Sequence, residues 1–384
     1  MNFALQKTLE LLLIILLGLL LQKKVAKKDL NGIKTLILSV ALPATIFVAL
    51  LKIKLDSSLL IFPFLALVFN FVMAFATKYL LNVSIADQDA PKKRTLMMLL
   101  PSLAPGLSCF PFIIVYLGDE YLALAALADV GNKIFVLILL YILAMHWYHL
   151  RTLKEVKESI GKKVKGLLIA LINEPINLVI IFALILLALG LNLAAFPEFM
   201  GNTITSMSVM MTPLVLLFIG MAVRVKFKEL GFIFTLLLRR AGITFLLSAI
   251  FVYIFPAIGA SMILLLVVFP QSACSFWPFA HMSAVSSLED KDGQQNPTFD
   301  IDFAVNVLAC SLPFSTVLII SIFSFSEVFI NPLLLLVIGG SMVVSSFVPF
   351  LLGRFKKNLF DNRVKEFSVL TNLAADAKPI ENES

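Results

Sequence analysis

The chain has 384 residues, of which 60% are hydrophobic and only 14% are charged. Soluble domains are about 45–50% apolar and about 25% charged, so this composition excludes an ordinary soluble protein and indicates a helical membrane protein. The formal net charge of +7 comes from short basic clusters between apolar stretches. Such clusters are typical of cytoplasmic loops, and we expect no binding of nucleic acid.

Apolar stretches long enough to cross a bilayer, about 17–25 residues each, recur along almost the whole chain and leave no room for a separate soluble domain. We predict eleven spans, at residues 8–22, 32–51, 58–81, 95–117, 121–148, 167–190, 203–223, 239–257, 260–283, 301–323 and 328–352. The first is expected to remain as a helix rather than a cleaved signal peptide, because most nearby basic residues follow it. Three cysteines, Cys109, Cys274 and Cys310, lie inside spans, where we expect packing rather than disulfides.

Basic residues gather in every second loop between these spans. They occupy residues 23–34, Lys78 with 92–94, 151–165, 224–228 with Arg239 and Arg240, and 354–365. Cytoplasmic loops are enriched in Lys and Arg, so we assign these loops to the cytoplasm. The N-terminus is then expected outside and the C-terminus in the cytoplasm, in the inner or plasma membrane of the cell.

Two of the predicted spans contain an unusual break, a run of small residues that carries prolines. The runs, residues 103–112 and 270–279, share the matched pairs Ser108 and Ser275, Pro111 and Pro278, and Phe112 and Phe279. Pro43 with Pro213 and Asn132 with Asn306 are further pairs at similar separations. The pairs predict a duplicated unit of five spans, and because five is odd the second copy must be inverted.

We therefore predict an all-α fold of two inverted five-helix repeats, each with one broken helix. The first repeat, with a cytoplasmic linker, is residues 1–166, and the second is residues 167–323. Residues 324–384 would hold an extra transmembrane helix and a tail.

Proline lacks a backbone donor and clashes with the preceding turn, so each break would leave backbone groups free at membrane depth. Lipid cannot satisfy such groups, whereas a polar substrate can. The candidate substrate-binding residues are Pro105, Gly106, Ser108, Pro111, Gln271, Ser272, Ser275 and Pro278. A pair of simple proline kinks is the alternative, and the repetition of the break favours the binding site.

Charges at membrane depth cost about 2.5–3.5 kcal/mol, so each one needs a partner or a function. Asp129 and Lys133 lie four residues apart in the fifth span and could form a neutralising pair beside Asn132. These three and Asn306 are candidate coupling groups for sodium or protons. A purely structural ion pair is the alternative.

Other polar residues have simpler expected roles. Asp300 and Asp302 are expected to cap the tenth span. Glu174 is either a buried or an interfacial carboxylate, and His281 is a candidate titrating group after the second break. The sequence carries no motif of a metalloprotease, serine hydrolase or nucleotide-binding loop. We therefore expect no enzyme activity and no bound cofactor.

The order and spacing of several short motifs resemble the auxin efflux carrier family of membrane transport proteins, from about Leu11 to Ile320. They are residues 42–47, 106–111, 116–120 with 122–132, 173–175 and 270–278. The resemblance implies ten core helices, crossing broken fourth and ninth helices, and transport of small organic anions. Ala104 and Cys109 depart from the asparagine and glycine that are usual in the family, so auxin itself is not the expected substrate.

The sequence thus predicts a permease for a small organic solute, expected to be an anion, that works by alternating access. A homodimer is one assembly that it allows. A sodium-coupled symporter of the bile-acid type, with the same five-helix plan, is one alternative. A membrane sensor or scaffold that docks a partner through the eleventh helix and the tail is another.

Overall fold

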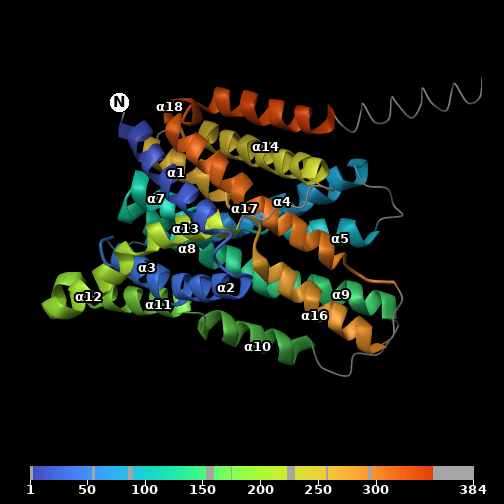
Figure 1. The fold of residues 1–384 in the computed structure, drawn as a ribbon, viewed down its shortest axis with the longest axis horizontal. Coiled ribbons are helices and arrows are strands. Elements are labelled where there is room, and N and C mark those ends of the chain that lie inside the picture. The colour runs from blue at the N-terminus through green and yellow to red at the C-terminus, as the bar shows by residue number, and fades with distance from the viewer. Residues whose placement is uncertain are drawn as a thin grey trace, which may run out of the picture.

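The computed structural model describes residues 3–53, 57–84, 90–152, 160–173, 175–222, 230–256, 258–292 and 296–348. Within these ranges the chain forms helices joined by turns and short extended links, with no β-strand (Figure 1). Glu174 and the tail after Val348 lie outside the described residues, so the expectations placed there stay predictions.

The first half of the chain, to residue 152, alternates long helices with short ones. They are α1 (Phe3–Leu21), α2 (Lys27–Leu36), η1 (Ile37–Ala41), α3 (Leu42–Leu50), η2 (Ser57–Leu60), α4 (Ile61–Ser84), α5 (Ala90–Leu99), α6 (Pro105–Ser108), α7 (Phe110–Tyr116), α8 (Asp119–Lys133), η4 (Ile134–Leu139) and α9 (Leu140–Thr152). The segments η1 and η4 are π-helical and continue their neighbours without a turn. Pro43 follows η1 closely, and its missing donor accounts for the widened turn there.

The second half continues in the same way. Its helices are α10 (Ile160–Asn173), α11 (Pro175–Ala188), η5 (Leu193–Ala195), α12 (Glu198–Val209), α13 (Met211–Ala222), α14 (Leu230–Ile254), α15 (Ala260–Val268), η7 (Phe269–Gln271), α16 (Phe276–Asp292), α17 (Ile301–Ser324), α18 (Ser326–Phe329) and a last helix, Pro332–Val348. Asp300 caps α17 as predicted, because its carboxylate accepts a hydrogen bond of 2.9 Å from the Phe303 amide.

Seven helical stretches of the described chain are long and apolar enough to cross a membrane. Three shorter apolar helices, Thr8–Leu21, Pro175–Ala188 and Pro332–Val348, coincide with the predicted first, sixth and eleventh spans. The predicted fourth span is broken into α5, α6 and α7. Large apolar side chains such as Leu20, Phe64 and Val337 point outward. Such an apolar surface belongs in lipid, and the chain is a multi-pass helical membrane protein.

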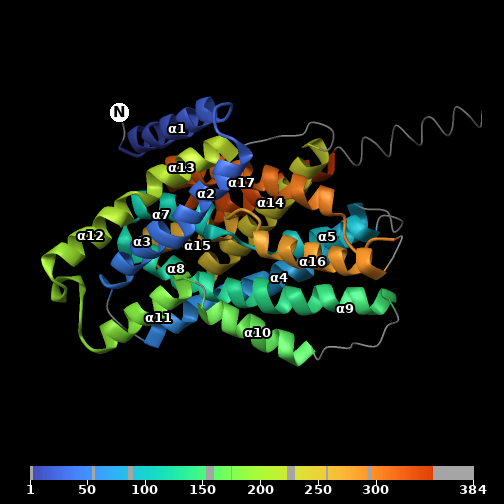
Figure 2. The ribbon, with the colours of Figure 1, turned by 60° about the horizontal axis from the view of Figure 1, so that its bottom comes forward.

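The helices can be described as two groups that are in close contact, since α3 of one packs along α8 of the other. In one group α1 runs along α13, and α3 runs along α11 and α12. In the other, α4 runs along α8, and α14 packs on α15 and α17 (Figures 1 and 2). Glycines permit the closest approaches: Gly18 meets Gly220 between α1 and α13, and Gly131 of α8 touches the Pro63 backbone of α4.

The structure corrects one prediction, the position of the eighth span. Arg239 and Arg240 were expected in a cytoplasmic loop, but α14 begins at Leu230 and holds both arginines within its length. Both side chains are buried. The charge pattern was misleading because hydrogen-bonded arginines inside a bundle look the same in sequence as arginines in a loop.

Candidate functional site

The two broken segments cross each other and are joined by hydrogen bonds. The Ala104 amide donates to the Ala273 carbonyl over 2.8 Å. The Ala273 amide in turn donates to Ser108 Oγ over 3.0 Å. A third bond of 2.9 Å runs from the Ser275 amide to Ser102 Oγ. Each break therefore provides hydrogen-bond partners for backbone groups of the other break that have no partner within a helix.

Prolines account for where the helices break and restart. Pro105 opens α6, and Pro111 stands in the first turn of α7, positions where the missing amide costs no helical hydrogen bond. Pro270 lies in the short turn that ends α15, and the following residue, Ser272, has extended backbone with φ −55° and ψ 150°. Residues 272–275 have no regular secondary structure, and α16 begins at Phe276.

The predicted substrate-binding residues all lie at this crossing. Ser108, Gln271, Ser272 and Ser275 are buried, as are Pro105, Pro111 and Pro278, whereas Gly106 is half-buried. Ser108 Oγ donates to the Ala104 carbonyl over 2.8 Å, and Ser272 Oγ donates to the Phe269 carbonyl over 2.6 Å. The hydroxyls thus hold the crossing itself together in this conformation.

Gln271 is only partly satisfied. Its amide nitrogen donates to the Ala241 carbonyl of α14 over 3.1 Å. Its side-chain oxygen is buried without a hydrogen-bond partner. A buried acceptor left unpaired costs about 1–3 kcal/mol, so this oxygen is available to a donor that enters the site.

The Asn132 side chain of α8 forms hydrogen bonds with the backbone of the first break. Its Nδ2 donates to the Leu103 carbonyl over 2.9 Å, and its Oδ1 accepts from the Leu103 amide over 3.2 Å. A side-chain amide here replaces the peptide partner that a continuous helix would provide. Asn70 of α4 also donates to Asn132 Oδ1 over 2.9 Å, while its own Oδ1 is buried without a partner.

The predicted pair of Asp129 and Lys133 is present beside Asn132. Lys133 Nζ lies 3.5 Å from Asp129 Oδ2, and both side chains are buried. Asp129 also accepts from Asn132 over 2.8 Å. Lys133 donates to Asn177 of α11 over 3.2 Å, so the ion pair touches both groups of helices.

Two serines of α17 bond to the backbone of the second break. Ser311 Oγ accepts from the Cys274 amide over 3.3 Å, and Ser315 Oγ donates to the Gln271 carbonyl. Asn306, which the sequence pairs with Asn132, lies five residues before Ser311 on α17, or about 7.5 Å along the axis. Ser311 and Ser315 thus give backbone groups of the second break side-chain partners, as Asn132 does for the first.

Arg240 is the residue at this site that the sequence analysis missed. Its Nε donates to the Leu100 carbonyl over 2.8 Å and its Nη2 to the Ser102 carbonyl over 3.2 Å. These carbonyls follow the C-terminus of α5, which ends at Leu99 just before the first break and where the helix dipole is negative. No carboxylate of the described chain forms an ion pair with Arg240. A sequence signal did exist, because nine mainly apolar residues, 230–238, precede the two arginines.

No family model matches this sequence, and no curated protein matches it. Its function is therefore inferred from the geometry of the crossing.

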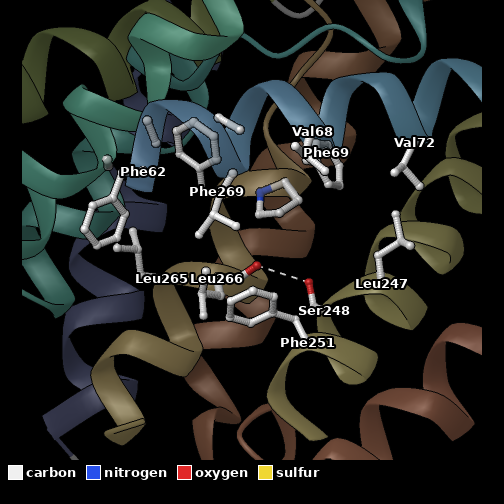
Figure 3. A pocket seen from close by; sticks show the side chains of 15 residues that line it. Phe62, Val68, Phe69, Val72, Leu247, Ser248, Phe251, Leu265, Leu266 and Phe269 are labelled. Atoms are coloured by element: carbon white, nitrogen blue, oxygen red, sulfur yellow. Dashed lines mark hydrogen bonds between the residues drawn. The ribbon is translucent and has the colours of Figure 1, made fainter. Parts of the chain in front are cut away.

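An apolar cavity of about 220 Å³ lies next to the crossing (Figure 3). It is lined by α4, α8, α14 and α15, and its inner wall includes Phe269 and Pro270 of the second break. Because Pro270 has no amide hydrogen, the Leu266 carbonyl lacks its helical donor, and Ser248 of α14 donates to it over 3.1 Å instead. The only side-chain hydroxyl in the lining is thereby satisfied.

Polar contacts join the two groups of helices at one end of the bundle. Lys52, just after α3, forms an ion pair of 2.6 Å with Asp119 at the start of α8. Thr8 of α1 lies 2.7 Å from the Tyr116 hydroxyl and 2.8 Å from Ser324 Oγ. This end of the interface is closed in the conformation described.

The opposite end of α5, α9, α16 and α17 carries a different set of contacts, within one group. Arg94 donates to the Thr298 carbonyl over 2.7 Å, and Arg151 donates to the Pro297 carbonyl over 2.7 Å. Glu289 accepts from the Thr298 amide over 3.0 Å. These bonds tie the loop before α17 to helices of both halves of the chain.

Proposed function

We propose that this chain is a secondary transporter that moves a small organic anion across the membrane by alternating access. The pair of crossing broken helices is the observation that carries the proposal. For an anchor or a scaffold such breaks only cost free energy, because an unbroken helix satisfies its own backbone in lipid. In a transporter they are useful, because half-helix ends place amides, carbonyls and dipoles around a solute.

The proposed architecture is two inverted five-helix repeats plus the last helix. Reciprocal packing supports it. In the first unit α1 is the first helix, and it packs on α13, which belongs to the second helix of the other unit. In the same way α3, in the second helix of the first unit, packs on α11, in the first helix of the other unit. A pseudo-twofold axis in the membrane plane produces this arrangement. The resemblance to the auxin efflux carrier family implies the same plan, and we propose membership of that family on this basis.

Arg240 supports an anionic solute. It is a buried cation whose hydrogen bonds go to the carbonyls of Leu100 and Ser102, just after α5, and the Ser102 hydroxyl itself binds the second break. No carboxylate of the described chain pairs with this charge, so a carboxylate nearby would be attracted to it. The candidate hydrogen-bond partners of the solute are Ser108, Gln271, Ser272 and Ser275.

Alternating access would follow from rocking of the two groups of helices. With the proposed outside position of the N-terminus, the contacts of Lys52 and Thr8 close the outer side. The structure would then represent a state closed to the outside. Lys133 contacts Asp129 within its own group and Asn177 across the interface, so it can change partners as the groups move.

A sodium-coupled symporter of the bile-acid type is the second candidate. Two buried amide oxygens without partners, on Asn70 and Gln271, favour it, because oxygen atoms are the ligands of hard cations. Uptake that depends absolutely on sodium would select this candidate over a proton-coupled or uncoupled carrier.

The test is uptake of labelled mono- and dicarboxylates into liposomes that contain the purified protein, with and without sodium. We expect uptake of at least one carboxylate, reduced about tenfold or more in Pro111→Ala and Pro278→Ala, which corresponds to a barrier increase of about 1.4 kcal/mol. Pro313→Ala is the matched control, because Pro313 lies inside the continuous helix α17. Full activity of both break variants would overturn the role of the crossing. A protein that binds a carboxylate but never transports it would instead indicate a sensor.

A further inference from the structure

The cavity beside the crossing has the properties of a site for a hydrocarbon chain. Its lining is formed by Phe62, Leu65, Ala66, Val68, Phe69, Val72, Ala125, Ala128, Leu247, Ser248, Phe251, Leu265, Leu266, Phe269 and Pro270. The Ser248 hydroxyl is engaged by Leu266, so nothing in this wall requires a polar ligand (Figure 3). Apolar cavities of about 150 Å³ stay dry and bind apolar molecules, and this one has about 220 Å³.

The cavity opens toward the outer surface of the bundle through α4. Val68 and Val72 line it and are each 40% exposed. Their neighbours Phe64, Phe71 and Phe75 on the same helix are exposed and apolar as well. In a membrane protein such a surface lies in the bilayer, so the rim of the cavity is reached by lipid and not by water.

The length of the cavity matches one leaflet. It extends along α4 from Phe62, next to the start of the helix at Ile61, to Val72. Ten residues of helix span about 15 Å, which is half of the hydrocarbon thickness of about 30 Å. A chain that enters from the headgroup level would thus run toward the middle of the bilayer and pass Phe269 and Pro270 of the second break on its way.

We propose that this cavity binds one acyl chain of a membrane phospholipid from the leaflet in which α4 begins. The chain would lie between α4 and α8 of the first unit and α14 and α15 of the second, and would pass Phe269 and Pro270 of the broken helix. It would fill space that the side chains leave open beside the crossing. Binding of the chain does not depend on the transport activity proposed above.

Quenching of tryptophan fluorescence by phospholipids with brominated chains tests the proposal in reconstituted full-length protein. The native Trp147 and Trp277 are replaced by phenylalanine, and one reporter, Phe251→Trp, is placed in the cavity wall. Tyr253→Trp is the matched control on the same helix, because Tyr253 is 71% exposed and does not line the cavity. Ala128→Phe then fills the cavity, with the smaller change Ala66→Leu as a second filling variant if the first does not fold.

We expect brominated phosphatidylcholine to quench both reporters, and either filling variant to remove most of the quenching at position 251 and none at position 253. Quenching at position 251 that is absent from the start, or that persists in both filled variants, would overturn the proposal. Quenching at position 251 by a brominated free fatty acid but not by the phospholipid would overturn the assignment to a membrane phospholipid.

Discussion

Single side chains at the crossing replace backbone partners that a continuous helix would supply. Asn132 does so for Leu103, and Ser108 for Ala273. The same principle explains Ser248, which donates to the carbonyl that Pro270 leaves without a donor. Spacing along the chain predicted the pairing of Asp129 with Lys133, since residues four apart share a helix face. It could not predict Asn132 or Ser108 as partners, because their targets lie on other helices.

Substitution of Arg240 tests whether its positive charge contributes to the binding of an anion. We expect Arg240→Gln to weaken the apparent affinity for a transported anion by about tenfold or more, or about 1.4 kcal/mol, because a buried cation is lost. Arg240→Lys, which keeps the charge but not the planar fork, should be less affected. The measurement is the concentration dependence of uptake in liposomes.

Arg239→Gln is the control for this experiment. Arg239 is the neighbour of Arg240, but it donates to Ser346 over 3.1 Å and lies 3.8 Å from the centre of the Phe347 ring, away from the break. Its removal should leave the apparent affinity unchanged. Equal loss in both variants would indicate that arginine in α14 supports only folding.

Helices in this protein are of two kinds, continuous ones that form the frame and broken ones that form the site. The breaks were predictable because prolines and small residues interrupt apolar spans at two matched places. The extent of α14 was not, because Arg239 and Arg240 resemble a loop until the partners of their side chains are known. The contacts between the groups of helices, such as Lys52 with Asp119, also required the tertiary structure.

Substitution of Lys52 and Asp119 tests whether their ion pair, at the ends of two helices, stabilises one of the alternating states. Lys52 is half exposed and Asp119 about a third exposed, so the pair is worth at most about 1 kcal/mol. We expect Asp119→Lys to change the rate of uptake by no more than about fivefold, because it destabilises only one of the alternating states. The combined exchange Lys52→Asp with Asp119→Lys should restore the rate.

A thermodynamic cycle over the four variants measures this coupling. If the double exchange behaves as the sum of the single changes, the pair does not act as a contact between the moving groups. Repeating the cycle at high salt provides a further control, since screening should reduce the coupling of an exposed pair.

The molecule as a whole joins two helix groups and adds the last helix, Pro332–Val348, along α14 (Figure 1). Gly339 of this helix meets Gly242 of α14 so closely that a Cβ at position 339 would lie 2.8 Å from the Gly242 carbonyl oxygen. Arg239 adds its contacts with Ser346 and Phe347. The last helix is therefore docked on the same group of helices that holds the crossing.

Gly339→Leu tests this docking. We expect a loss of about 1–3 kcal/mol in the stability of the packed state, because the side chain forces two backbones apart, and a lower melting temperature of the purified protein. Gly340→Leu is the matched control, because a Cβ at position 340 has no neighbour within 4 Å. Equal melting temperatures of the two variants would contradict a docked last helix.

Composition and periodicity alone determined that this chain crosses the membrane repeatedly, where most spans lie and where two of them break. These properties are local, since the free energy of transfer into lipid and the missing amide of proline depend on a few neighbouring residues. Tertiary structure alone decided which groups bond the two breaks to each other, that Asn132 and Arg240 bond to backbone groups at the first break, and that an apolar cavity lies beside the second. Those features depend on contacts between residues far apart in the chain, such as the bond from Ser275 to Ser102, 173 positions away, which no local pattern encodes.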